Sequence, residues 1–170
     1  MNAILQKQQL LDAVGSADAY GEIQNTIERV ATAFMFHQAE KIKSHFCLEE
    51  EVSLEFPGIE KQQGPEAVVA AITGLAGAPL KPGEMVDSHL CSPVITLDPD
   101  GKSAHGSWEV ISAIGEPTPD GPEKAKALWE FGKLKTDLVC RNGKWMILAL
   151  RYERRVRCDY DLGWAKEGEA

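Results

Sequence analysis

Apolar residues recur at helical spacing early in the chain. The recurring positions are Ile23, Ile27, Val30, Ala31 and Phe34. Asp18 precedes them as an N-cap, and the same period continues over residues 39–46. The pattern therefore predicts one long helix over residues 18–45, with a break near His37. Residues 2–14 before it are predicted to form a short polar helix or a loose arm.

The pattern then changes to strand spacing and back. Residues 52–56 alternate between apolar and polar side chains and end at Pro57-Gly58, which predicts a short strand. Pro65 opens a second helix over residues 65–75, because proline suits the first helical turn. Glycines and prolines from residue 74 to residue 83 predict a loop.

Two long hairpins are predicted in the second half of the chain. The first joins residues 89–97 to residues 103–114 through the turn at Asp98-Pro99-Asp100-Gly101. The second joins residues 127–140 to residues 145–157 through Asn142-Gly143, the strongest short hairpin signal. Between the hairpins, residues 115–122 hold three prolines and two glycines and are predicted to form an exposed loop.

This order of elements predicts an α+β fold. We expect a strongly curved, cone-shaped mixed β-sheet with helices packed on its concave face. At 170 residues the chain is expected to form a single domain over 1–170. Within it, residues 1–17 are an N-terminal arm or helix, residues 18–166 are the cone, and residues 167–170 are a tail.

Composition narrows the classes of partner. The net charge of −8 disfavours nucleic acid and anionic membranes, which need a basic surface, and no apolar run approaches a membrane span. The N-terminus lacks a secretory signal, and the four cysteines are scattered without a CxxC pair. We therefore expect a cytoplasmic protein with reduced thiols. The histidines are scattered and no nucleotide-binding motif is present, so neither a metal nor a cofactor is predicted.

His89 is the first candidate for chemistry. Strict alternation places it on one strand face with Cys91, Ile95 and Leu97, which makes it a lone titratable group among apolar neighbours. Burial in a pocket would lower its pKa and leave a neutral imidazole as a base. The alternative is a core or rim histidine with a backbone partner.

Carboxylates on the strands are further candidates. They are Glu55, Asp87, Glu109, Glu130 and Asp137. Glu130 shares a face with Leu128 and Leu134 and is therefore the one predicted to be enclosed, where it could move a proton. The alternative is an ion pair with Arg151 or Arg154 across the hairpin. Trp108, Trp129 and Trp145 either stack on a planar ligand or fill the core.

Several motifs, in this order, resemble the SnoaL-like group of the nuclear transport factor 2-like superfamily. They are Gly64-Pro65-Glu66-Ala67-Val68, His89 before Pro93-Val94-Ile95, Ala104-x-Gly106-x-Trp108, residues 132–137, Asn142-Gly143-Lys144-Trp145 and Tyr160-Asp161-Leu162-Gly163-Trp164. The relatives include ketosteroid isomerase, scytalone dehydratase, bile-acid dehydratase and polyketide cyclases. The resemblance implies an apolar pocket inside the cone with a few polar groups.

The resemblance also suggests roles for two histidines. The related dehydratases place a general acid/base histidine near His89, and near His37 they carry an aspartate that pairs with it. They also carry a tyrosine one helical turn before that aspartate. This chain departs from them, because residues 31–37 hold neither tyrosine nor carboxylate. For His37 the alternative is an exposed histidine at a helix end.

We therefore predict a cofactor-free dehydratase or isomerase that acts by proton transfer on a small apolar, cyclic or polycyclic metabolite. His89 and His37 are the predicted catalytic residues. The predicted pocket residues are Phe34, Phe36, Phe56, Cys91, Ile95, Trp108 and Glu130. The alternative is a non-catalytic ligand-binding or accessory module of the same fold. A homodimer through the outer sheet face is expected, because an open sheet must cover its apolar face and edges.

Overall fold

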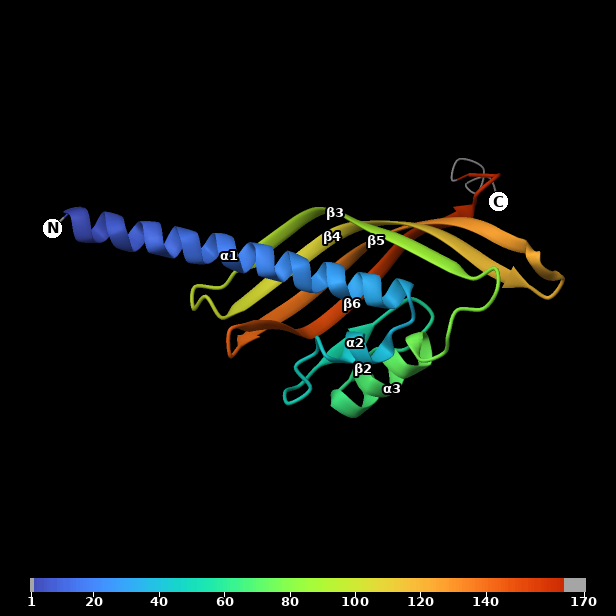
Figure 1. Cartoon of the computed structure of the whole chain (residues 1–170), viewed down its shortest axis with the longest axis horizontal. Coiled ribbons are helices and arrows are strands. Elements are labelled where there is room, and N and C mark those ends of the chain that lie inside the picture. The colour runs from blue at the N-terminus through green and yellow to red at the C-terminus, as the bar shows by residue number, and fades with distance from the viewer. Residues whose placement is uncertain (1, 164–170) are drawn as a thin grey trace.

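The computed structural model describes residues 2–163, with three helices and six strands (Figure 1). The helices are α1 (Asn2–Met35), α2 (Ala39–Lys43) and α3 (Pro65–Ala76). The strands are β1 (Ser53–Glu55), β2 (Gln62–Gln63), β3 (Met85–Leu97), β4 (Ser103–Thr118), β5 (Gly121–Arg141) and β6 (Lys144–Asp159). The predicted tail over residues 167–170 lies outside the described residues.

The first helix is longer than predicted. Residues 2–14 continue into α1 without interruption, and Figure 1 shows this end of the helix projecting past the sheet. The predicted break near His37 is confirmed: its φ is +52°, a left-handed conformation that ends the helix before α2 begins. Within residues 2–163 no helix is both long and apolar enough to cross a bilayer.

The strands form one mixed sheet in the order β2-β1-β6-β5-β4-β3. Strand β1 pairs parallel with β6, and the other neighbours pair antiparallel. The Asn142-Gly143 turn has φ of +52° and +75°, as its hairpin type requires. Figure 1 shows the long strands curving around α1, so the predicted curved α+β architecture is confirmed.

The predicted loop over residues 115–122 is wrong. Strand β4 continues to Thr118 and β5 begins at Gly121, so the turn between them is short. A register shift between Glu116 and Thr118 places Pro117 at an irregularity of the ladder, where a missing N–H breaks no regular pairing. The proline content therefore marked a bulge and not the end of the strands.

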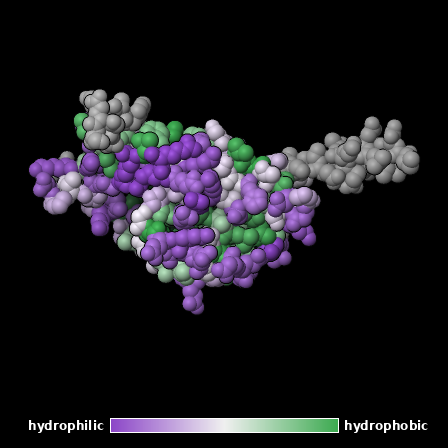
Figure 2. All heavy atoms as spheres, turned by 180° about the vertical axis from the view of Figure 1, so that it is seen from behind, coloured by the Kyte–Doolittle hydropathy of each residue, from purple (hydrophilic) through white to green (hydrophobic). Residues whose placement is uncertain are grey.

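The core lies between the concave face of the sheet and the helices. Its largest fully buried side chains include Trp108, Phe46 and Ile147. A Cβ at Gly106 would lie 2.5 Å from the ring of Trp108, so the glycine leaves room for the indole on the sheet. Trp108 and Trp145 thus fill the core, whereas Trp129 stacks against Phe131 and Tyr160. Figure 2 shows green apolar areas among purple polar ones on the rear surface.

Bulges decide which side chains face inward. On β3, Cys91 pairs with Glu109 and Val94 with Ser107, so residues 92 and 93 together stand opposite residue 108 alone. The extra residue reverses the alternation. Val86, Ser88 and Leu90 face inward before the bulge, and Ile95 and Leu97 pack on the core after it.

Candidate functional site

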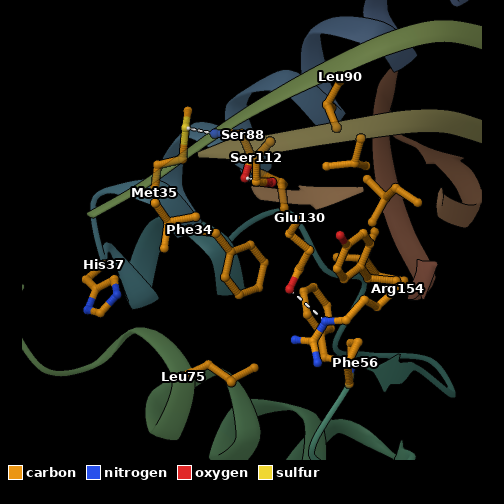
Figure 3. A pocket seen from close by; sticks show the side chains of 18 residues that line it. Phe34, Met35, His37, Phe56, Leu75, Ser88, Leu90, Ser112, Glu130 and Arg154 are labelled. Atoms are coloured by element: carbon orange, nitrogen blue, oxygen red, sulfur yellow. Dashed lines mark hydrogen bonds and ion pairs between the residues drawn. The ribbon is translucent and has the colours of Figure 1, made fainter. Parts of the chain in front are cut away.

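A pocket of about 250 Å³ lies between α1 and the concave sheet face (Figure 3). Most of its lining is apolar. The lining comprises Val30, Ala31, Phe34, Met35, His37, Phe56, Pro57, Leu75, Val86, Ser88, Leu90, Val110, Ser112, Glu130, Leu134, Leu150, Tyr152 and Arg154. A cavity of this size and character suits a small ring with few polar groups.

Glu130 is the carboxylate of this pocket. Its side chain is buried, with the residue 5 % exposed, and Arg154 Nε donates a hydrogen bond of 2.6 Å to its Oε2. Arg157 Nη1 lies 3.6 Å from the same oxygen. The Tyr152 hydroxyl also interacts with this carboxylate. The ion pair therefore fixes the position of one carboxylate oxygen, Oε2, at the wall of the pocket.

A bulge on β6 brings Arg154 and Arg157 to Glu130. On β6, Val156 pairs with Phe131 and Arg154 with Gly132, so Arg155 is the extra residue. Residues three apart on a regular strand face opposite ways, but this bulge turns Arg154 and Arg157 to the same face. Arg155 points the other way and contacts Glu109. The ion pair between Arg154 and Glu130 confirms the predicted pairing. Arg151, the other predicted partner, contacts Glu55 and Glu153.

Tyr152 lies beside Glu130, with its ring over Gly132. A Cβ at Gly132 would lie 2.5 Å from Tyr152 Oη, so only glycine leaves room for this ring position. Phe56 packs on Tyr152 at 6.0 Å and on Phe34 at 5.3 Å between ring centroids. Burial, and then the charge of Glu130, raise the pKa of the Tyr152 phenol. The hydroxyl is buried and makes no hydrogen bond of regular geometry within residues 2–163, although the Glu130 carboxylate lies near it.

Two serines on the strands next to Glu130 also face the pocket. Ser88 Oγ and Ser112 Oγ lie 2.7 Å apart, and the Ser88 N–H donates to Met35 Sδ at 3.1 Å. Ser112 is 3 % exposed and is the register partner of Glu130. Ser88, Ser112 and Glu130 therefore form one row across β3, β4 and β5.

His37 lines the edge of the pocket. Its Nδ1 donates a hydrogen bond of 2.7 Å to the Ala78 carbonyl, which leaves Nε2 as the acceptor nitrogen of the neutral ring. Figure 3 shows Phe34 between His37 and the Glu130–Arg154 pair. The structure thus brings His37, Phe34, Phe56 and Glu130 around one cavity, with His37 apart from the carboxylate.

His89 lies outside this cavity, contrary to our expectation. Its side chain is 71 % exposed and its Nε2 lies 3.6 Å from Asp87 Oδ1 on the convex face. The reason is the bulge at residues 92–93: the apolar face of Ile95 and Leu97 does not continue to His89, because the alternation reverses between them. An exposed imidazole next to a carboxylate is not the enclosed base that the pattern predicted.

Four other predicted pocket residues also lie away from the pocket lining. Phe36 is 60 % exposed at the end of α1, and Cys91 follows His89 onto the convex side. Ile95 packs against the core, and Trp108 is buried in it. The predictions from β3 failed because they assumed one unbroken alternation.

Three polar residues of the pocket were not predicted from the sequence: Ser88, Ser112 and Tyr152. Each lies two residues from an apolar side chain that faces the pocket on the same strand, such as Leu90 for Ser88 and Leu150 for Tyr152. That signal is present in the sequence, but it is weak for uncharged residues. Among the described residues no three His, Cys, Asp or Glu side chains gather as a metal site would require.

The family assignment agrees with this architecture. The SnoaL-like domain family matches residues 15–151, and the chain therefore belongs to that family. No curated protein matches the chain.

Solved structures share the fold at low sequence identity. A candidate scytalone dehydratase from Novosphingobium aromaticivorans superposes with a TM-score of 0.70 at 12 % identity, over 87 % of this chain and 91 % of that one. A hexachlorocyclohexane dehydrochlorinase, LinA type 2, gives 0.69 at 11 % identity, over 86 % and 92 %. A candidate dehydratase of the nuclear transport factor 2-like family from Streptomyces avermitilis gives 0.68 at 13 % identity, over 81 % and 96 %. These likenesses concern the fold, which does not determine the reaction.

Proposed function

We propose that this protein is a cofactor-free enzyme that moves a proton on a small cyclic metabolite, as a dehydratase or an isomerase, and that Glu130 is the group that moves it. One observation carries the proposal: a buried carboxylate lines an apolar pocket, with one oxygen held by Arg154 and the Tyr152 hydroxyl beside it. A carboxylate positioned in this way is suited to act as a general base. The dehydratase-type proteins among its structural neighbours support the same class of reaction.

The proposed reaction begins with a ring carbon next to a carbonyl group. Glu130 takes the proton from that carbon, and the electron pair of the C–H bond moves into an enolate. In an isomerisation, the protonated Glu130 returns the proton to another carbon of the same system. In a dehydration, the electron pair of the enolate expels a β-hydroxyl group, which leaves as water with that proton.

His37 is the candidate for a second proton-transfer group. It lines the opposite edge of the pocket, and its Nε2 is the nitrogen not used by Ala78. A ligand filling the cavity would lie between the two residues, so His37 would act at a different position of the ring from Glu130. His89 has no role in this proposal, because its side chain lies on the convex face.

Solvent exchange tests the proposal on a panel of compounds, because the substrate is unidentified. The protein is incubated in deuterated water with cyclic ketones and β-hydroxyketones, and proton NMR records loss of the α-proton signal or formation of an enone. Glu130→Gln should lower the rate on an active compound by about 100- to 10,000-fold. Glu109→Gln, on the outer face of β4, is the matched control and should retain the rate. Equal rates for wild type and Glu130→Gln would refute the role of Glu130.

A non-catalytic binding module is the second candidate function. The observation that favours it is the ion pair itself, because the carboxylate oxygen that Arg154 holds at 2.6 Å is already engaged in a contact within the protein. A binding module would be stabilised by a cyclic ligand in a thermal melt and would show no exchange or turnover with it. The same NMR panel therefore separates the two functions.

We also propose that two copies associate through the convex sheet face. Ile111 and Val156 are exposed there, next to the stacked rings of Trp129, Phe131 and Tyr160. An apolar area of this kind favours a partner surface over water. Light scattering at micromolar concentration should give the mass of a dimer, and Ile111→Glu with Val156→Glu should give a monomer. A wild-type monomer under those conditions would exclude the proposal.

A further inference from the structure

The polar groups of the pocket lie in one line. Ser88 pairs with Ser112 in the register of β3 and β4, and Ser112 pairs with Glu130 in the register of β4 and β5. Register partners on neighbouring antiparallel strands have Cα atoms about 4.5–5.5 Å apart. The three residues therefore share one row of a mostly apolar floor, and Figure 3 shows the Glu130 side chain extending from this row toward Arg154.

The two hydroxyls leave one donor unused. Each serine hydroxyl has one hydrogen to donate and two lone pairs, and the contact of 2.7 Å between Ser88 and Ser112 uses a single hydrogen. Met35 Sδ is occupied by the backbone N–H of Ser88. Either serine can be the donor in that contact, and within residues 2–163 no further hydrogen bond uses the remaining hydroxyl hydrogen. A buried donor without a partner is unfavourable, so this position needs an acceptor from the pocket.

We infer that the Ser88–Ser112 pair is the binding site for an oxygen substituent of the ligand, and that the ligand is therefore an oxygenated ring, such as a cyclic ketone. This inference rests on the proposed function and names its substrate class. A carbonyl oxygen that accepts the spare hydroxyl hydrogen has its α-carbon two bonds away. The ring then lies along the row with that carbon toward the Glu130 carboxylate.

The same arrangement discriminates against unsubstituted rings. A hydrocarbon or halogenated ring of the same shape can occupy the apolar walls but cannot accept a hydrogen bond from the serine pair. It would leave the buried hydroxyl unpaired, and sites built around a hydrogen bond reject ligands that lack the partner atom. Binding should therefore depend on the oxygen substituent as well as on ring size.

The test compares two probes of one shape, β-tetralone and tetralin, which differ in a single carbonyl group. Dissociation constants are measured by ligand-observed NMR for wild type, Ser112→Ala and Ser88→Ala. Wild type should bind β-tetralone more tightly than tetralin. Replacement of the serine that donates to the ketone should weaken its binding about 2- to 10-fold, the effect of one hydrogen bond, and neither alanine variant should change tetralin binding. Ser107→Ala, on the convex side of β4, is the control and should change neither constant.

The outcomes separate this inference from the proposed function. Equal affinities of wild type for the two probes, or parallel losses for both in the serine variants, would overturn the inference while the pocket remains. A ketone-specific loss in Ser88→Ala alone would support it even if Ser112→Ala fails to fold. A ketone-specific loss without α-proton exchange in wild type would retain the serine site and reject the enzyme. Binding of neither probe would reject both.

Discussion

The concave and convex faces of the sheet use the same strands in opposite ways. Arg154 and Arg155 are adjacent on β6, yet Arg154 contacts a buried carboxylate in the pocket, whereas Arg155 contacts Glu109 in solvent. The first pair lies in an apolar environment where an unpaired charge is costly, and the second is screened by water. Chemically similar ion pairs therefore contribute differently to stability according to the face of the sheet that they occupy.

The histidines show the same contrast. His37 lies at the pocket edge with its Nδ1 fixed by a backbone carbonyl, whereas His89 and His105 lie on the convex side with aspartates beside them. Titratable residues on a strand are thus functional candidates only once their face is known. In this sheet the face depends on bulges such as those at residues 92–93 of β3 and at Arg155 of β6.

Deletion of Ser92 should have the largest effect, because it removes the extra residue of the β3 bulge. Alternation would then run unbroken, and either Leu90 or Ile95 and Leu97 would turn to solvent. Exposing these apolar side chains should lower the free energy of unfolding by roughly 3–5 kcal/mol, at about 1.5–3 kcal/mol for each full side chain. Urea unfolding followed by circular dichroism measures this. Near wild-type stability would show that the bulge does not determine the inward face.

Arg154→Met and Arg155→Met compare the two faces directly. Loss of Arg154 leaves Glu130 buried with only the longer contact to Arg157, which should cost about 3 kcal/mol in the free energy of unfolding. Loss of Arg155 should leave the melting temperature within experimental error, because its partner is open to water. Thermal melts of both variants in one buffer give the comparison. Equal destabilisation would contradict the distinction between the faces.

Gly132→Ala should disturb the pocket through Tyr152. The added methyl group would overlap the ring, which must then move off the strand toward the cavity. Overpacking of this kind costs about 1–3 kcal/mol, and affinity for ring probes should fall with it. Gly74→Ala is the control, since its Cβ meets nothing within 4 Å and alanine favours a helix by about 0.5–1 kcal/mol. Unchanged binding in Gly132→Ala would show that the Tyr152 ring can move without entering the cavity.

The smallest expected effect is that of His105→Gln, on the convex face, on the pH dependence of stability. The hydrogen bond of His105 to Asp137 at 2.6 Å raises the pKa of the imidazole, and the charge of Asp98 adds to this. A raised folded-state pKa stabilises the fold below the unfolded value of about 6.5, and this contribution disappears as the pH rises through the folded pKa. Wild type should therefore lose slightly more stability than His105→Gln between about pH 5.5 and about pH 8. Identical pH profiles in urea unfolding would exclude the coupling.

Much of the fold was predictable from local pattern. The helical period through Phe34, the break near His37 and the Asn142-Gly143 turn depend on near neighbours in the chain, and the structure confirms each. The position of Glu130 was also predictable, because apolar residues flank it at alternate positions and its strand pairs regularly with β4 there.

Other features depended on pairing between strands. Nothing local in residues 85–97 shows where β3 gains its extra residue, because that residue is defined by its partners on β4, and so His89 was placed on the wrong face. The same holds for Arg155, whose bulge turns Arg154 and Arg157 together toward Glu130. The sequence by itself thus determined the elements, their order and the enclosed carboxylate. Only the tertiary structure decided which other polar groups meet it, because register is a property of paired strands.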